Sequence, residues 1–250
     1  MKIYEFIATC RSGHHSVLNW ILMNKIGFQY NWEYKFVRLG ENGMFHLSEA
    51  NHDIPLSFEY IDEALNQIDT LFVGYEDTPW DYTIFSDDTT YRGPMSFRDY
   101  KKYDMEYQGR FVLLRNFYTN LASRLKSNEN KMFGKWNNDQ VHLFDVGEKF
   151  IFRWKSQARA CVENKVQYLK FEDWLTNKEI RENFLYDNFG LKDIYGIDGI
   201  SGTRSSFGTF KGVTDRDKEV EIPEEVKDLI RKDSELHYLI GALGYEYKNI

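Results

Sequence analysis

Apolar residues along the chain form short continuous runs that alternate with segments of helical periodicity. Runs at residues 2–8 (KIYEFIA), 70–75 (TLFVGY) and 110–115 (RFVLLR) have the length and composition of buried strands. In residues 14–26, apolar side chains recur at spacings of three and four, which is typical of one face of a helix. The beginning of the chain therefore predicts a strand, a short turn and a helix.

The rest of the chain repeats these two patterns. We expect further strands at 34–39 and 165–171, and helices at 57–68, 117–127, 139–164, 178–189 and 223–243. Residues 195–217 are rich in Gly, Ser and Thr and predict a loop, whereas residues 76–110 predict long loops or a lid inserted at an acceptor site. Strands that alternate with helices imply an α/β fold of three layers, with a mostly parallel central sheet flanked by helices.

Composition and charge narrow the classes of function. An even composition over 250 residues favours a single domain, residues 1–250. The 39 Asp and Glu against 32 Lys and Arg give a formal charge of −7, which argues against a nucleic-acid partner but not against a small basic pocket. Cys10 and Cys161 lie far apart and indicate reduced thiols. No apolar run reaches the roughly 18 residues of a membrane span, and none resembles a signal peptide, so we expect a cytoplasmic protein.

The turn after the first predicted strand has the residue types of an anion-binding loop. It reads Arg11-Ser12-Gly13-His14-His15-Ser16. Backbone N–H groups at a helix N-terminus point outward and carry partial positive charge, and Gly13 lets a phosphate approach the backbone closely. Arg11 adds a fixed cation, and the serine hydroxyl groups add donors. The alternative interpretation of this segment is an ordinary capped turn between strand and helix.

Two further arginines stand in positions suited to anions. Arg115 ends a predicted strand, and Ser123 follows eight residues later, about two turns into the next helix. Ligands collect outside the carboxyl ends of strands in open α/β sheets, so this pair predicts a second phosphate site, with a surface arginine that caps a helix as the alternative. The third candidate is Arg204-Ser205-Ser206, in the late loop, and a solvated linker is its alternative.

Other chemical motifs are absent or weak. The chain has no GxxxxGK[ST] string, and the glycines at 196, 199 and 202 do not have the spacing or the preceding strand of a dinucleotide fingerprint. The histidines show no metal-ligand spacing. Asp215 and Asp217 match the metal-binding DxD pattern, but they lie in the charged turn TDRDKE, where we expect solvated side chains. The sequence therefore predicts no metal site.

The three anion-binding candidates, in this order, resemble the sulfotransferases that use 3′-phosphoadenylyl sulfate (PAPS). Residues 11–16 resemble the family's (K/R)SGTT loop, which holds the 5′-phosphosulfate. Arg115 and Ser123 match the pair that holds the 3′-phosphate, and Phe171 resembles the aromatic residue that contacts adenine. The segment Arg204-Ser205-Ser206 is similar to the late loop that closes over the 3′-phosphate.

The resemblance spans nearly the whole chain and has departures. Arg11 stands where many members have Lys, His14 and His15 replace hydroxyl residues, and Ser205 and Ser206 replace Lys-Gly. The resemblance implies a P-loop NTPase-like fold, with PAPS as co-substrate and adenosine 3′,5′-bisphosphate as product, and without a metal. It also implies a hydroxyl or amine acceptor on a small molecule or carbohydrate. The aromatic residues within 75–107 are candidates for the lining of an acceptor cleft, with packing onto the core as the alternative.

The implied reaction assigns two roles to side chains. Arg11 would stabilise the leaving phosphate, and a general base would accept the acceptor's proton. Glu76, at the end of a predicted strand, is the first choice as base and Asp77 the second, and His14 and His15 are rivals. Either histidine also fits a simpler role as a donor to phosphate. Two alternatives to a sulfotransferase stay open, a non-catalytic nucleotide-binding protein of the same fold and a P-loop nucleotide kinase.

Overall fold

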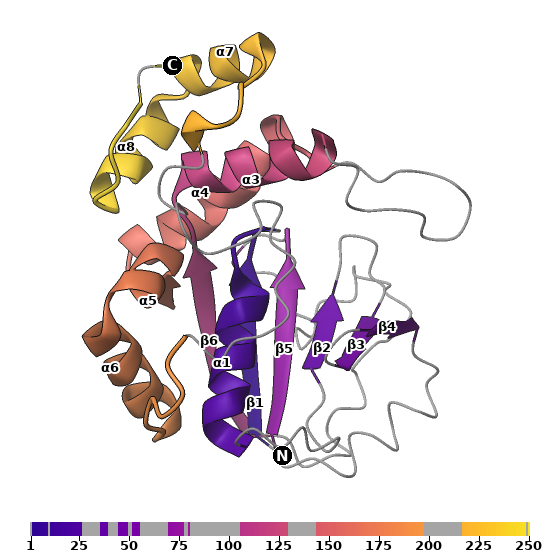
Figure 1. The fold of residues 1–250 in the computed structure, drawn as a ribbon. Coiled ribbons are helices and arrows are strands. Elements are labelled where there is room, and N and C mark those ends of the chain that lie inside the picture. The colour runs from indigo at the N-terminus through magenta and orange to yellow at the C-terminus, as the bar shows by residue number, and fades with distance from the viewer. Residues whose placement is uncertain are drawn as a thin grey trace.

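The computed structural model describes a seven-stranded sheet and the helices that cover it (Figure 1). It describes residues 2–9, 11–26, 36–39, 45–49, 52–55, 70–77, 80, 106–129, 144–197, 217–248 and 250. The strands are β1 (Lys2–Ala8), β2 (Phe36–Leu39), β3 (Phe45–Glu49), β4 (His52–Pro55), β5 (Thr70–Glu76), β6 (Glu106–Leu114) and β7 (Gln167–Lys170). The helices are α1 (His14–Ile26), α3 (Phe117–Glu129), α4 (Glu148–Val162), α5 (Phe171–Thr176), α6 (Lys178–Phe189), α7 (Glu224–Lys232) and α8 (Ser234–Ala242).

The strands stand in the order β4-β3-β2-β5-β1-β6-β7. β2, β5, β1, β6 and β7 are joined by parallel pairings, and β3 and β4 add an antiparallel edge. The central strand β1 pairs with β5 on one side and β6 on the other, so the carboxyl ends of all three lie at one edge of the sheet. The α/β fold with a mostly parallel sheet is therefore confirmed.

Alternate residues of the central strands enter two separate cores. On one face Ile3 and Ile7 of β1 pack with apolar residues of α3, α4, α7 and α8. On the other face Tyr4 and Phe6 pack with apolar residues of α1, α5 and α6. Successive side chains of a strand point to opposite faces, so a continuous apolar run such as KIYEFIA is what a strand covered on both faces requires. The expected helices thus flank both faces of the sheet.

Most element boundaries agree with the sequence patterns, and the differences have local causes. Residues 2–8, 14–26 and 178–189 form their predicted elements without a shift. β6, however, begins at Glu106, four residues before its predicted start, so residues 106–110 of the expected lid are strand. These residues, EYQGR, are polar and include a glycine, so they lack the apolar signal of a buried strand. The antiparallel strands and α5 are also additions to the predicted elements.

Further differences lie in the second half of the chain. The helix expected from residue 139 begins at Glu148, and residues 144–147 before it are not helical. Asp217, expected to be solvated, is instead nearly buried and paired with Lys248. The helix expected at 57–68, Asp215, most of the lid segment and residues 198–216 lie outside the described residues.

Candidate functional site

The loop between β1 and α1 has an unusual backbone. Arg11 has a φ of 67° and Gly13 a φ of 90°, and Ser12 between them donates its N–H to the carbonyl oxygen of Thr9 at 3.1 Å. Left-handed residues that alternate with ordinary ones turn successive N–H groups toward one point, which makes a concave site for an anion. Ser12 is 1% exposed, and its hydroxyl oxygen has no hydrogen-bond partner among the residues that the structure describes. The loop therefore has a left-handed turn and a buried polar group that is not satisfied within the described protein.

Helix α1 begins directly after this loop. The N–H groups of Ser16 and Val17 donate to the carbonyl oxygen of Gly13, at 3.0 and 3.3 Å. The N–H groups of His14 and His15 belong to the first turn, where a helix offers no internal acceptor. The side chains of both histidines lie outside the described residues. The backbone at this helix end has the polarity that favours an anion.

Phe171 lies against the same loop. A Cβ atom placed on Gly13 would lie 2.2 Å from Cε2 of Phe171, so ring and glycine are in direct contact. The ring is buried and stacks on Trp174, with centroids 5.4 Å apart. The guanidinium carbon of Arg115 lies 5.3 Å from the ring centroid. The structure thus brings Phe171 to the predicted loop, and its contact with adenine stays a prediction.

Arg115 joins the end of β6 to the loop. Its side chain is 2% exposed, and Nη1 donates to the carbonyl oxygen of Arg11 at 2.7 Å. Nε donates to Oγ1 of Thr119 at 3.1 Å. The cap of α3 is made by Asn116, whose Oδ1 accepts from the N–H groups of Tyr118 and Thr119. Arg115 is therefore not a surface arginine that caps the helix. Ser123 is buried two turns into α3, and its contact with a phosphate stays a prediction.

Glu172 holds this arrangement together, a role that the sequence patterns did not indicate. Its Oε1 accepts from the N–H of Asn116 at 3.1 Å and from the Thr119 hydroxyl at 3.3 Å. Its Oε2 accepts from the hydroxyl of Tyr245 at 3.0 Å. Burial, followed by the nearby Glu172 carboxylate, raises the pKa of Tyr245, so this phenol remains a donor. One carboxylate thus ties α3 and the C-terminal segment to the site.

A second buried network lies at the carboxyl ends of β1 and β5. Asp77 has a φ of 56°, and its N–H donates to the carbonyl oxygen of Ala8 at 2.9 Å. Its carboxylate forms an ion pair with Arg124, whose side chain is fully buried in α3. Nε of Arg124 donates to Asn120 at 3.3 Å, and Asn120 donates to the Thr9 hydroxyl at 2.7 Å. Asp77 therefore takes part in a network that fixes the strand end next to the loop between β1 and α1.

Of the remaining predicted residues, the structure describes either the backbone alone or nothing. Glu76 is the last residue of β5 and stands opposite Ala8 in the β1–β5 register, at the edge of the sheet where the loop begins. Its side chain is outside the described residues, as are Arg204, Ser205 and Ser206 entirely. The choice of Glu76 as base therefore stays a prediction.

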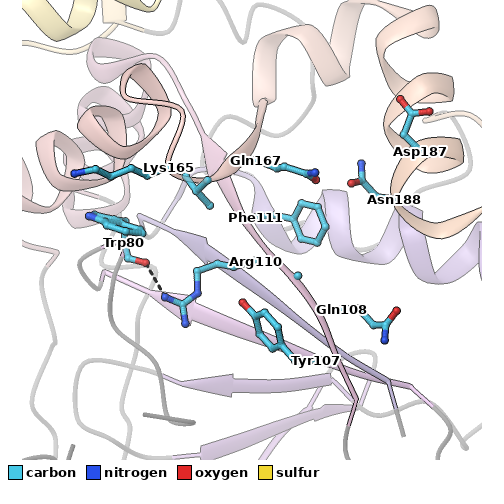
Figure 2. A pocket seen from close by; sticks show the side chains of 11 residues that line it. Trp80, Tyr107, Gln108, Arg110, Phe111, Lys165, Gln167, Asp187 and Asn188 are labelled. Atoms are coloured by element: carbon cyan, nitrogen blue, oxygen red, sulfur yellow. Dashed lines mark hydrogen bonds between the residues drawn. The ribbon is translucent and has the colours of Figure 1, made fainter. Parts of the chain in front are cut away.

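A cavity of about 520 Å³ lies elsewhere, beside the amino-terminal half of β6 (Figure 2). Its described lining includes none of the residues predicted to bind nucleotide. Two of the aromatic residues expected to line an acceptor cleft, Trp80 and Tyr107, do line it, whereas Tyr75 is buried and donates its hydroxyl to Glu5. The cavity is thus separate from the loop between β1 and α1.

Comparisons with known proteins identify no family for this chain. No protein-family model, no curated protein and no solved structure matches the chain. Among the described helices, none combines the length and apolar character needed to cross a membrane. The described part of the chain also holds no cluster of three or more His, Cys, Asp or Glu side chains suited to a metal ion. Function must therefore be argued from the site itself.

Proposed function

We propose that this protein binds PAPS at the loop between β1 and α1 and transfers its sulfuryl group to a hydroxyl or amine acceptor. One observation carries the proposal. The left-handed loop at the N-terminus of α1 holds a buried Ser12 hydroxyl with no partner among the described residues, and the guanidinium group of Arg115, directly after the neighbouring strand β6, lies against the loop backbone. A nucleotide with phosphate groups at both ends of its ribose needs cations and N–H donors from two such elements.

The proposed reaction is an in-line displacement. A bond forms between the acceptor oxygen or nitrogen and sulfur, the bond from sulfur to the phosphate oxygen breaks, and adenosine 3′,5′-bisphosphate leaves. Negative charge grows on the leaving phosphate, and Arg11 together with the N–H groups of the loop stabilises it. Arg115 and Ser123 bind the 3′-phosphate, and the fold is P-loop NTPase-like in this proposal.

The acceptor's proton passes to a general base at the end of β5. We choose Glu76 over Asp77, because the carboxylate of Asp77 already pairs with the buried Arg124. A base must reach the acceptor atom, and the register places Glu76 next to the strand that leads into the loop. His14 or His15 then serves as a donor to phosphate. The acceptor is a small molecule or a carbohydrate.

Thermal unfolding with and without nucleotides tests the proposal. A ligand that binds only the folded protein stabilises it, by about 2.7 kcal/mol at a concentration one hundred times its Kd. We expect adenosine 3′,5′-bisphosphate to raise the unfolding temperature, and ATP and NAD to raise it much less. Stabilisation by ATP without a response to the bisphosphate would favour a nucleotide kinase. Bisphosphate binding without transfer to any acceptor would favour a non-catalytic nucleotide-binding protein.

Two serine variants make the test specific to the loop. Ser12→Ala removes a hydroxyl group that has no partner in the described protein, so it should leave the ligand-free protein as stable as before. We expect it to reduce the shift caused by the bisphosphate. Ser127→Ala is the matched control, because Ser127 of α3 is also 1% exposed and its hydroxyl also lacks a described partner. An equal bisphosphate shift in both variants would exclude Ser12 from the binding site.

A further inference from the structure

One edge of the amino-terminal half of β6 is left uncovered by the strands that the structure describes. β7 pairs with β6 only from Phe111 to Leu114. Residues 106–110 pair with β1 on the other side, and no described strand covers their free edge. The cavity of about 520 Å³ lies at this edge, within the usual size range of about 300–1,000 Å³ for small-molecule sites (Figure 2). Backbone donors and acceptors of β6 therefore stand beside a hollow large enough for a ligand.

A β-bulge determines which side chains face the two sides of this edge. Ile3 pairs with Tyr107 and the next residue of β1 pairs with Gly109, so Gln108 is the extra residue. Residues three apart on a regular strand point to opposite faces, but the bulge places Tyr107 and Arg110 on the same side of β6. Figure 2 shows Gln108 and Phe111 on the other side. Side chains from both sides of β6 therefore line the cavity.

The two cations of the described lining, Arg110 and Lys165, already have carboxylate partners, and the carboxylate of Asp187 also lines the cavity. Arg110 donates twice to Oε2 of the buried Glu5, at 2.7 and 3.0 Å, and its Nη1 donates to the carbonyl oxygen of Trp80. Lys165 forms an ion pair with Glu163 at 2.6 Å. Partial burial, and then the nearby Glu5 carboxylate, raise the pKa of Tyr107 to about 12, so this phenol is neutral. A cavity whose cations all have carboxylate partners, in a chain of charge −7, is not suited to an anion.

The remaining lining combines ring faces with side-chain amides. Trp80 and Tyr107 provide aromatic surface, and Tyr107 is 55% exposed although it belongs to a strand. Gln108, Gln167 and Asn188 also line the cavity, and each amide can both donate and accept. Sugars present the matching chemistry, because their hydroxyl groups donate and accept while their C–H faces pack on aromatic rings.

We infer that this cavity is a binding site for a neutral carbohydrate. The site goes beyond the proposed sulfuryl transfer and does not depend on it. Arg110 precedes Arg115 by five residues, which in a strand corresponds to roughly 16 Å, so a sugar here lies away from the nucleotide loop. A peptide added as a strand is a poorer occupant, because the bulge at Gln108 interrupts the regular ladder that strand addition requires.

Binding of neutral trisaccharides to the whole protein tests this inference. Maltotriose, cellotriose, mannotriose and triacetylchitotriose are titrated by calorimetry, with contacts mapped by saturation-transfer NMR. We expect at least one to bind, and trigalacturonate, which is anionic, to bind more weakly. Binding should persist in saturating adenosine 3′,5′-bisphosphate, since the two sites are separate. Failure of all four sugars, stronger binding of trigalacturonate, or displacement by the bisphosphate would overturn the inference.

Variants of exposed residues locate the site. Tyr107→Ala should weaken binding of the best sugar about tenfold, the effect of losing one aromatic contact. Gln167→Ala, which removes an exposed amide from the other wall, should also weaken it. Tyr186→Ala is the matched control, because Tyr186 is an equally prominent tyrosine, 66% exposed on α6, that does not line the cavity. Equal affinity of the Tyr107 and Tyr186 variants would refute this location, provided that both unfold at the temperature of the parent protein.

Discussion

The ring of Phe171 occupies the space that a side chain on Gly13 would need. The two residues are 158 positions apart in the chain. Phe171 is the first residue of α5 and directly follows β7. Gly13 is therefore required for two reasons, its left-handed φ of 90° and its contact with an aromatic ring. The shape of the loop between β1 and α1 therefore depends on Phe171, which follows the last strand of the sheet, and this dependence can be measured.

Gly13→Ala should destabilise the protein by about 2–4 kcal/mol, because it combines backbone strain with overpacking against Phe171. Urea unfolding measures the loss. Gly190→Ala is the control, since Gly190 also has a positive φ, of 66°, but its Cβ would meet nothing within 4 Å. That variant should lose only about 1 kcal/mol, from strain alone. Equal losses in the two variants would mean that Phe171 does not restrict Gly13.

The ion pair between Asp77 and Arg124 should contribute strongly to stability. Both side chains are buried, and Asp77→Asn leaves the charge of Arg124 without its carboxylate partner. We expect a loss of about 3–5 kcal/mol in the free energy of unfolding. Glu129→Gln, which breaks an exposed pair with Lys126 on the same helix, should cost less than about 1 kcal/mol. A small loss in Asp77→Asn would show that Arg124 finds other compensation.

Local patterns predicted the centre of the fold well. β1 and α1 lie where their apolar spacing placed them, because a strand buried on both faces and a helix packed on the sheet are specified by neighbouring residues. The positions of Arg11 and Arg115 at one edge of the sheet followed from the rule that parallel strands end together. The carbonyl oxygen of Arg11 and Nη1 of Arg115 are 2.7 Å apart in the structure.

The rest depends on contacts between residues distant in sequence. No spacing indicates that Glu172 accepts from both Asn116 and Tyr245, or that Asn120 donates to Thr9. The early start of β6 was missed because its first residues form a polar edge that no described strand covers, where burial imposes no apolar pattern. The position of the cavity at this edge was missed for the same reason, although Trp80 and Tyr107 were among the aromatic residues expected to line a cleft.

Asp233 should make stability depend on pH in the acid range. It caps α8 by accepting from the N–H of Leu236 at 2.9 Å, and it pairs with Lys155 at 2.7 Å. Partial burial alone would raise the pKa of Asp233, but the hydrogen bonds from Lys155 and Leu236 outweigh it and hold the pKa below its ordinary value of 3.8. The stabilisation is therefore present above about pH 4 and is lost as pH falls through the lowered pKa.

Asp233→Asn isolates this charge, because asparagine also caps helices well. At pH 7 we expect the variant to be less stable than the parent protein in urea unfolding. The difference between the two should shrink as pH falls below about 4. A difference that stays constant from pH 7 to pH 3 would show that the carboxylate charge of Asp233 does not stabilise the fold.

Glu76 and His15 have different proposed roles, and their variants should differ in kinetics. Loss of a general base lowers turnover by about 10²- to 10⁴-fold, so Glu76→Gln should lower kcat in a sulfate-transfer assay while the bisphosphate binds as before. His15→Ala removes a donor to phosphate and should mainly raise the KM for PAPS. Turnover that is undiminished in Glu76→Gln would remove Glu76 as the base. A large loss of kcat in His15→Ala, greatest at high pH and smaller at low pH, where the histidine of the parent enzyme is itself protonated, would transfer the role of base to the histidine, because an imidazole must be neutral to accept a proton.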